Sequence, residues 1–298
     1  MLSARLAATL CLAIPASLVA DTPHLREKTA KLGLVARACS IFGVHEIILY
    51  ADEGSHDRPG DMQLCAQLLG FIETPQYLRK RLFGLNPSLK FAGILPPLQI
   101  PSHDVPRLIR DCRRGDLRDG VVVTRHGETL AVDVGLERTL ECRGEFPVGA
   151  RISVRITGVG KSLVGEIIDP TNISISGEDM RPIYWGYRVY EASSLGKLLN
   201  DVRWDLRIGT SRYGIPVQEV LPALSKDLKT SRSTLLAFGS PKMGLREILA
   251  QEKTDPKDVF HYFVNTVPDQ QTATVRTEEA ILLSLGILNL TGNVAGFS

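Results

Sequence analysis

Three short segments in the second half of the chain combine glycines with small polar residues, each directly after an apolar run. They are residues 208–214 (IGTSRYG), 238–244 (FGSPKMG) and 264–271 (VNTVPDQQ). Glycine lets backbone groups approach a ligand closely, and side chains such as those of Thr210, Asn265 and Thr266 can fix a ligand's orientation. We predict that the three segments together bind a ligand, although each alone is equally compatible with an ordinary turn.

The apolar runs before these segments, together with three earlier runs, predict the strands of a parallel sheet. Predicted strands are residues 9–20, 45–50, 187–190, 204–208, 234–238 and 259–264. Predicted helices are residues 22–43, 61–71, 74–83, 194–202, 244–251 and 277–290. Loops at the carboxyl ends of strands converge on the ligand crevice in such α/β folds, so the order of elements supports a shared site.

The middle of the chain follows a different pattern. Three consecutive valines within residues 119–125, alternating apolar residues at 130–136 and 152–156, and a further apolar segment at 163–168 predict four or five antiparallel strands. We expect a small β-barrel of the OB type over residues 87–184. It would be inserted between two halves of one α/β domain, residues 1–86 and 185–298.

Composition and motifs exclude several kinds of chemistry. The 298 residues carry a net charge of +2, which neither demands nor excludes a nucleic-acid partner. Five cysteines without a Cys-x-x-Cys pair and six histidines without metal-ligand spacing predict no metal site. Residues 158–162 (GVGKS) resemble the end of a P-loop, but Arg155 stands where the first glycine is required, so a hairpin turn is favoured.

The N-terminal apolar run allows two interpretations. Arg5 followed by residues 6–20 has the charged flank and apolar stretch of a secretory signal. Pro15 and Ser17 interrupt the run, and it leads directly into a helix start, which favours a first buried strand. We therefore expect a cytoplasmic protein without a membrane partner.

Basic residues gather before and within the predicted barrel. The candidates for phosphate contacts are Arg79, Lys80, Arg81, Arg113, Arg114, Arg151 and Arg155. Arg151 and Arg155 alternate with apolar residues, so both should project from the outer face of one strand. For any one cluster, a solvated face is an equally good interpretation.

Several of these motifs together resemble a known family, the SPOUT-class (α/β-knot) RNA methyltransferases, in the branch with an inserted OB-like domain. The motifs that carry the resemblance are Glu73–Arg79 (ETPQYLR), Phe91–Pro96 (FAGILP), Gly209–Ser211 (GTS), Asn265-Thr266 and Thr274–Ala280 (TVRTEEA). The resemblance spans nearly the whole chain, and its C-terminal part is the most specific.

The resemblance implies an α/β fold with a SPOUT-type trefoil-knotted parallel sheet and an inserted OB-like barrel. It also implies S-adenosyl-L-methionine as the cofactor and a homodimer with the site at the subunit interface. The cofactor-binding residues that it implies are Thr210, Gly239, Gly244, Asn265 and Thr266, and the catalytic candidates are Arg212 and Arg276. Two positions depart from the family pattern: Tyr213 stands where the family has arginine, and residues 269–271 (DQQ) replace a Gly-Gln-Gly-like turn.

The expected function is S-adenosylmethionine-dependent methylation of structured RNA, foremost ribosomal RNA and a uridine-type base nitrogen. Methyl transfer from a sulfonium depends on positioning and needs no metal. The alternative is a non-catalytic RNA-binding or ribosome-assembly factor that keeps the fold as a scaffold. If Gly239 lines the cofactor, its replacement by valine should abolish cofactor binding and leave the fold intact.

Overall fold

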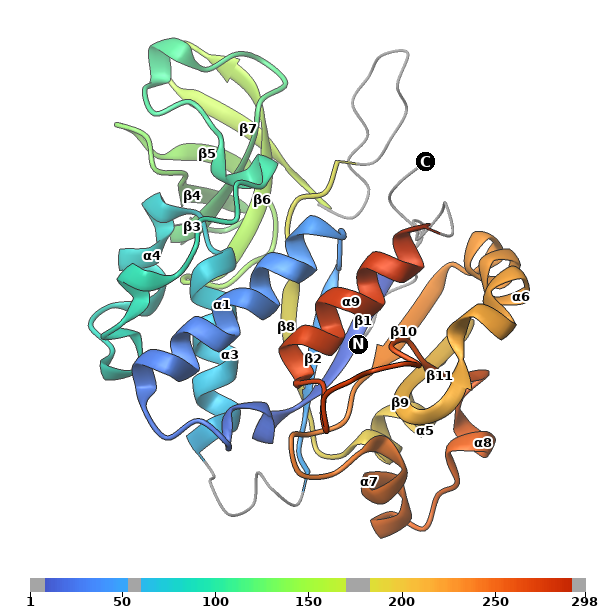
Figure 1. Ribbon diagram of the computed structural model, residues 1–298. Helices are drawn as coiled ribbons and strands as arrows, with labels where there is room; N and C mark the ends of the chain where they lie inside the picture. Colours follow the sequence, from blue (N-terminus) through green and yellow to red (C-terminus); the bar gives the residue numbers. More distant parts are fainter. Residues whose placement is uncertain (1–8, 53–59, 170–182, 291–298) are drawn as a thin grey trace. The chain divides into compact units, whose positions relative to one another are not determined.

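The chain divides into two compact units. The computed structural model describes residues 9–52, 60–169 and 183–290. The first unit lies within residues 1–73, 87–98 and 186–298 and holds a sheet with helices, and the second lies within residues 74–86 and 99–185 and holds a barrel (Figure 1). These limits differ from the predicted ones between residues 74 and 98, because residues 74–86 group with the barrel and residues 87–98 with the sheet.

The first unit is built on a six-stranded parallel sheet. Its strands are β1 (Thr9–Pro15), β2 (Glu46–Tyr50), β8 (Arg188–Ala192), β9 (Leu206–Pro216), β10 (Ser233–Ala237) and β11 (Tyr262–Asn265). They lie in the order β11-β9-β10-β1-β2-β8, and each neighbouring pair is parallel. The α/β class with a parallel sheet, as predicted from the order of elements, is confirmed.

Strand β1 is buried over its whole length, as the apolar residues 10–14 predict, and the predicted strand ends at Pro15, where the 3-10 turn of residues 16–19 begins. Cys11 and Ala13 belong to a core cluster with Leu198 of α5 and Leu249 of α7. Leu12, which points to the opposite face, is also fully buried. Apolar residues therefore cover both faces of the sheet at this strand.

Seven α-helices of the first unit are described. They are α1 (Leu25–Ile41), α3 (Gly60–Glu73), α5 (Leu195–Asp201), α6 (Val217–Thr230), α7 (Leu245–Gln251), α8 (Pro256–Val259) and α9 (Thr277–Leu290), with short 3-10 turns η1 (Ala16–Val19), η2 (Pro87–Leu89) and η3 (Ala92–Ile94). Among these residues no helix is long and apolar enough to cross a membrane. Helices α1 and α9 pack against each other (Figure 1).

Helix α6 was not predicted from the sequence. Its buried residues Val217, Leu224 and Leu228 recur at helical spacing. Pro216 precedes the helix and Pro222 lies within it, and prolines at these places are more typical of a loop. The helical spacing of apolar residues is present in the sequence, but the two prolines favour the interpretation of a loop.

The second unit contains a closed five-stranded barrel. It comprises α4 (Gln76–Phe83), η4 (Pro101–His103), η5 (Ile109–Asp111), β3 (Leu117–His126), β4 (Thr129–Asp133), β5 (Leu140–Arg143), β6 (Arg151–Val159) and β7 (Leu163–Ile168). The strand order is β3-β4-β5-β7-β6, closing on β3. All pairs are antiparallel as predicted except β5 with β7, which is parallel.

His261 joins β9 to the start of β11. Its Nδ1 accepts the backbone N–H of Arg207 at 2.9 Å, and its own backbone N–H donates to the Arg207 carbonyl at 2.9 Å. Burial and the charge of Arg207 lower the pKa of His261, with Asp227 opposing them. The folded chain therefore favours the neutral imidazole, which keeps Nδ1 free to accept.

This link predicts a pH dependence of stability. Because the folded pKa lies below the unfolded value of about 6.5, the stabilisation is complete above that value and is lost as the pH falls through the folded pKa. Denaturant unfolding over a pH series should show this loss in the parental protein, and His261→Asn, which keeps an acceptor without titrating, should remove it. His126→Asn, at an exposed barrel turn, is the control; an unchanged pH profile in His261→Asn would refute the assignment.

Candidate active site and nucleic-acid interface

The three predicted ligand segments follow neighbouring strands. Strands β10, β9 and β11 are adjacent and parallel, so their carboxyl ends lie at one edge of the sheet. Ile208 of β9 is in register with Leu236 of β10 and with Tyr262 of β11. The three predicted ligand segments, which begin at or just after these residues along the chain, therefore start at about the same level of the sheet.

The first segment is an excursion within β9 and not a loop after it. Phe263 pairs with Gly209, whereas the next residue, Val264, pairs with Ile215. Five residues, 210–214, thus stand opposite a single peptide bond of β11. A Cβ atom at Gly214 would collide with the Val264 backbone, so glycine is required where the excursion returns to the strand.

The second segment closes on itself. The backbone N–H of Ser240 donates to the Met243 carbonyl at 2.8 Å, and the N–H of Met243 donates to the Ser240 hydroxyl at 3.0 Å. A Cβ atom on Gly239 would lie 2.9 Å from the Cα of Gly244, whereas one on Gly244 would meet only the flexible carboxylate of Glu247 at 2.7 Å. The absence of a side chain at Gly239 is therefore required by the loop's own closure.

The polar side chains of the candidate site bind the protein itself. The Thr210 hydroxyl donates to the Ala237 carbonyl at 2.9 Å. The Asn265 amide donates to the Arg212 carbonyl at 2.9 Å, and the Thr266 hydroxyl lies 2.9 Å from that of Ser284. Asn265 and Thr266 are 9% and 8% exposed, so both sit beneath the surface of this edge. Thr210 and Asn265 thus tie the strand ends to one another, and Thr266 ties the third segment to α9.

The two candidate arginines differ in how they are held. The Arg212 guanidinium donates to the Ala273 carbonyl at 3.0 Å and to the Tyr213 hydroxyl at 2.6 Å, and lies 4.6 Å from the centre of the Tyr213 ring. Arg276 is exposed, and within the described residues its guanidinium has no ion pair with Glu278 or Glu279. Arg212 therefore links the excursion to the segment before α9, while Arg276 remains accessible.

Two hydroxyl groups of this edge were not predicted from the sequence. The Tyr50 hydroxyl donates to the Phe238 carbonyl at 2.6 Å, and the Thr277 hydroxyl donates to the Gly239 carbonyl at 3.2 Å. The cap of the last helix is made by Glu279, whose carboxylate accepts the Arg276 N–H at 2.9 Å. Tyr50 lies in no motif and Thr277 lies within the motif at residues 274–280, but in both cases only the fold shows which carbonyl the hydroxyl reaches.

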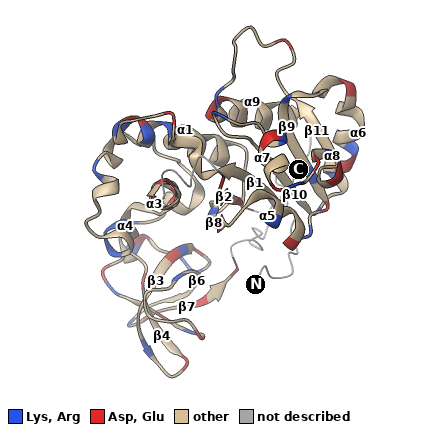
Figure 2. Cartoon of the chain, turned by 90° about the horizontal axis from the view of Figure 1, so that it is seen from below, with Lys and Arg blue, Asp and Glu red and all other residues tan. Residues whose placement is uncertain are grey.

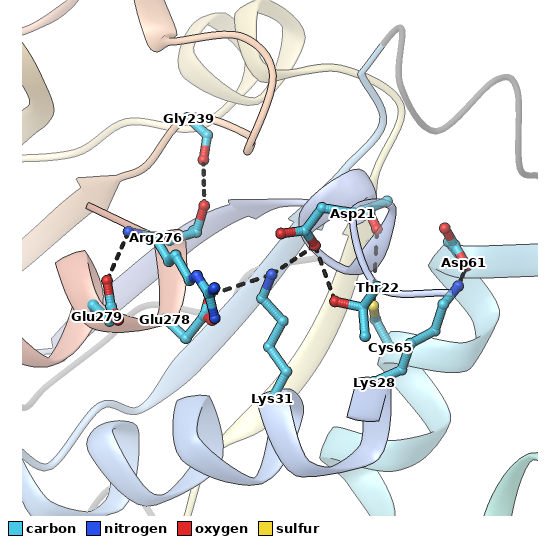
Figure 3. Close-up of polar contacts among 12 residues, drawn as sticks. Asp21, Thr22, Lys28, Lys31, Asp61, Cys65, Gly239, Arg276, Glu278 and Glu279 are labelled. Atoms are coloured by element: carbon cyan, nitrogen blue, oxygen red, sulfur yellow. Dashed lines mark hydrogen bonds and ion pairs between the residues drawn. The ribbon is translucent and has the colours of Figure 1, made fainter. Parts of the chain in front are cut away.

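Buried charges connect α1 with the start of α9. The Lys31 ammonium lies 2.8 Å from an Asp21 oxygen and 3.4 Å from a Glu278 oxygen, with the side chains of Lys31 and Glu278 7% and 8% exposed (Figure 3). Burial raises the pKa of Asp21, but the hydrogen bond and charge of Lys31 outweigh it and lower the pKa. Removing one partner of such a pair is costly, because it leaves the other charge buried without compensation.

The barrel unit carries the basic residues that were predicted to contact phosphate. Figure 2 shows Lys and Arg on α4 and the barrel strands, interspersed with Asp and Glu. Lys80, Arg113 and Arg114 are exposed. The guanidinium of Arg79 donates to the Thr74 carbonyl at 2.8 Å, and that of Arg81 pairs with Asp133 at 2.7 Å.

Arg151 does not project freely from its strand. Its guanidinium pairs with Asp119 at 2.5 Å, and the two side chains are 27% and 2% exposed. Asp119 also accepts the Ser153 hydroxyl at 2.6 Å and the Trp185 indole N–H at 2.9 Å. The alternation along the strand does place Arg151 outside the barrel, but its charge is paired with that of Asp119. Arg155, whose side chain is 39% exposed, pairs with Glu166 at 3.0 Å.

Metal ligands were not predicted, and the described residues contain no group of three or more His, Cys, Asp or Glu side chains able to hold a metal ion. The five cysteines are all buried and free. Burial raises the pKa of the Cys39 thiol, which keeps it protonated and unreactive.

Comparison with known proteins identifies the family. The model of a family described as "Putative RNA methyltransferase" matches residues 9–288. The chain is 35% identical, over 94% of its length and 76% of the relative's, to the 28S rRNA (uridine-N(3))-methyltransferase of Mus musculus, and 34% identical, over 94% and 77%, to that of Homo sapiens. It is 30% identical to an uncharacterized protein of Halobacterium salinarum, over 93% of this chain and 98% of that protein.

The match covers both units, the α/β sheet and the barrel. The chain belongs to this family of RNA methyltransferases. It is accordingly a methyltransferase, and the edge formed by β9, β10 and β11 is the candidate for its active site.

The geometry of residues 239–244 shows that Gly239→Val should also destabilise the fold, which the sequence did not predict. A valine there would press on the Gly244 Cα and the Met243 carbonyl, so we expect a loss of about 1–3 kcal/mol in the free energy of unfolding. Gly244→Ala displaces only the Glu247 carboxylate and should stay within about 0.5 kcal/mol of the parent. Chemical denaturation measures both, and equal stability of the two variants would contradict the close approach.

The contacts of the two barrel arginines predict unequal costs. Arg151→Gln leaves the buried Asp119 carboxylate without its cation and should lower the unfolding free energy by roughly 2–4 kcal/mol. Arg155→Gln breaks only an exposed pair and should cost less than about 1 kcal/mol. Thermal and denaturant unfolding of the two variants test this; an Arg151 variant as stable as the Arg155 variant would show that the Asp119 pair contributes nothing.

Proposed function

We propose that the protein is an S-adenosylmethionine-dependent RNA methyltransferase that binds its cofactor at the carboxyl ends of β9, β10 and β11. The observation that carries the proposal is the meeting of three strand ends, one of them closed by a pair of touching glycines, in a chain of this family. S-adenosylmethionine supplies a methyl group on a positively charged sulfur. The site's own polar side chains are used internally, so backbone groups around Gly239 and Gly244 are the natural ligand contacts.

Thr210, Asn265 and Thr266 support this site by holding its backbone. Thr210 orients the end of β10 through the Ala237 carbonyl, and Asn265 holds the excursion through the Arg212 carbonyl. The residues fit a cofactor that is recognised largely through backbone groups, because bare backbone at Gly244 is exposed. In this proposal their contribution is to fix geometry, which is the main requirement for an in-line transfer.

We propose ribosomal RNA as the substrate and a uridine N3 atom as the acceptor. The mouse and human relatives are named as 28S rRNA (uridine-N(3))-methyltransferases, and the chain aligns with them along 94% of its length. The N3 nitrogen carries a proton that has to leave before or during methyl transfer. A guanidinium cannot accept that proton, so Arg212 or Arg276 would act by stabilising negative charge on the base. The exposed Arg276 is the more available of the two.

A knotted path of the chain is part of the proposal. Residues 210–214 leave β9 opposite β11, and the Asn265 side chain at the end of β11 is bonded to this excursion. The chain then returns from the edge of the sheet to place α9 against α1. A trefoil knot of the SPOUT type requires a C-terminal segment that threads through a preceding loop, and the bond of Asn265 to the excursion supports such a path.

We further propose that the barrel is of the OB type and binds RNA. Numbered within the barrel, its strands lie in the order 1-2-3-5-4 with strands 3 and 5 parallel, an arrangement compatible with a five-stranded Greek-key barrel of this type. Lys80, Arg113 and Arg114 are the basic residues best placed for phosphate contacts, because they are exposed. Arg79, Arg81 and Arg151 serve internal contacts, and Arg155 is shared with Glu166.

A homodimer through α1 and α9 completes the proposal. Leu34 and Ile41 on α1 are 59% and 48% exposed, and Leu282 and Leu283 on α9 are 47% and 43% exposed. The two helices pack side by side, so these four apolar side chains belong to neighbouring surfaces. Large exposed apolar side chains gathered in one region are typical of a protein interface.

Two measurements test the proposed function. Calorimetry with S-adenosylmethionine should detect binding of one cofactor per chain, and incubation of the protein with ribosomal RNA and isotopically labelled cofactor should give labelled N3-methyluridine on mass spectrometry of the digested RNA. Arg276→Lys and Arg276→Ala should reduce the methylation rate more than cofactor affinity. A folded protein that binds no cofactor would favour the alternative function, a non-catalytic RNA-binding scaffold. Label in a nucleoside other than N3-methyluridine would show that the acceptor is a different atom.

A further inference from the structure

Three consecutive backbone carbonyls at the end of β10 each accept a hydroxyl from a different element. Thr210 of β9 donates to Ala237, and Tyr50 of β2 donates to Phe238. Thr277 at the start of α9 donates to Gly239. We call these three hydroxyls the hydroxyl clamp. It holds the chain where β10 leaves the sheet and enters the glycine loop, residues 239–244.

Two of the three donors, Tyr50 and Thr277, are buried. Tyr50 is fully buried, and Thr277 is 6% exposed, so neither side chain can exchange its bond for water. Burial, reinforced by the charges of Asp52 and Glu252, raises the pKa of Tyr50 well above its ordinary value. The phenol therefore stays protonated and remains a donor at neutral pH.

The start of α9 is anchored independently of the loop. The Arg276 N–H is held by Glu279, and Glu278 lies 3.4 Å from the buried Lys31 ammonium, which also pairs with Asp21 (Figure 3). In the sequence, Thr277 lies directly between Arg276 and Glu278. Its hydroxyl is thus presented to the Gly239 carbonyl from a helix that α1 keeps in place.

We propose that Tyr50 and Thr277 are positioning residues of the methyltransferase, which set the glycine loop in the conformation that receives the cofactor. The inference rests on the proposed function, because it concerns the same site. Neither side chain needs to touch the cofactor: Tyr50 fixes the carbonyl of Phe238, directly before the loop, and Thr277 fixes that of Gly239, the loop's first residue. A loop that is already ordered binds without the entropic cost of ordering it, so the clamp raises cofactor affinity by preorganisation.

The proposal predicts that removing a clamp hydroxyl weakens S-adenosylmethionine binding, whereas an equal loss of stability elsewhere in the unit does not. Tyr50→Phe and Thr277→Val each remove one hydroxyl at nearly constant shape and should weaken S-adenosylmethionine binding roughly tenfold, about the effect of one hydrogen bond. Thr277→Ser retains the donor and should restore the parental affinity. Calorimetry gives the dissociation constant of each variant.

Matched controls exist elsewhere in the same unit. Tyr187→Phe removes a buried phenol bonded to the Leu69 carbonyl at 3.0 Å, and Thr29→Val removes a buried hydroxyl bonded to the Leu25 carbonyl at 2.7 Å. Both should keep the dissociation constant within about twofold of the parent even where they lower the melting temperature. Clamp variants with parental affinity, or controls that weaken binding equally, would overturn the proposal.

Hydrogen exchange without cofactor separates the clamp from the proposed function. The amides of Ser240 and Met243 are hydrogen-bonded within the loop and should exchange faster in Tyr50→Phe and Thr277→Val than in the parent, Thr277→Ser and the two controls. A parental protein that binds no cofactor would overturn both the proposed function and the role of the clamp in binding. Accelerated exchange would then still establish that the hydroxyls order the loop, and unchanged exchange would refute that as well.

Discussion

Parallel pairing of β9, β10 and β11 is the constraint on which the candidate site depends. Parallel strands cannot be joined by tight turns, so α6 and then α7 and α8 carry the chain back between them. All three strands therefore end at the same edge of the sheet. The common register then puts Thr210, one residue past Gly209, beside the end of β10, where its hydroxyl reaches the carbonyl of Ala237.

A consequence of this arrangement is that the polar side chains of the edge are already engaged. Asn265 and Thr266 bind protein groups, as do the hydroxyls that hold the end of β10. Recognition of a ligand would then fall to backbone groups, which every residue type carries. This explains why the site shows few residue types that are diagnostic of a particular chemistry.

The sequence was sufficient where the signal was local and failed where the partner was distant. The apolar run at residues 9–20 predicted a buried strand, which is confirmed for residues 9–15, whereas residues 16–19 form a 3-10 turn. The alternation in β6 predicted a barrel strand, which is confirmed. Arg151 was expected on an open face, because nothing near it in sequence indicates that Asp119, 32 positions earlier, pairs with it. The contact of Thr277 with Gly239 likewise spans 38 positions, and helix-capping preference gave no hint of it.

The position of β1 in the middle of the sheet affects how the chain is made. Thr9 pairs with Ser233, so one side of β1 has no neighbour until more than two hundred further residues have been synthesised. At about 5–20 residues per second, the ribosome takes roughly 10 to 45 seconds to deliver β10. Throughout that interval this apolar strand, buried in the folded protein, presents a free edge to other chains, a template for misassociation. Molecular chaperones that shield such an edge during translation would therefore influence how much of this protein reaches its native state.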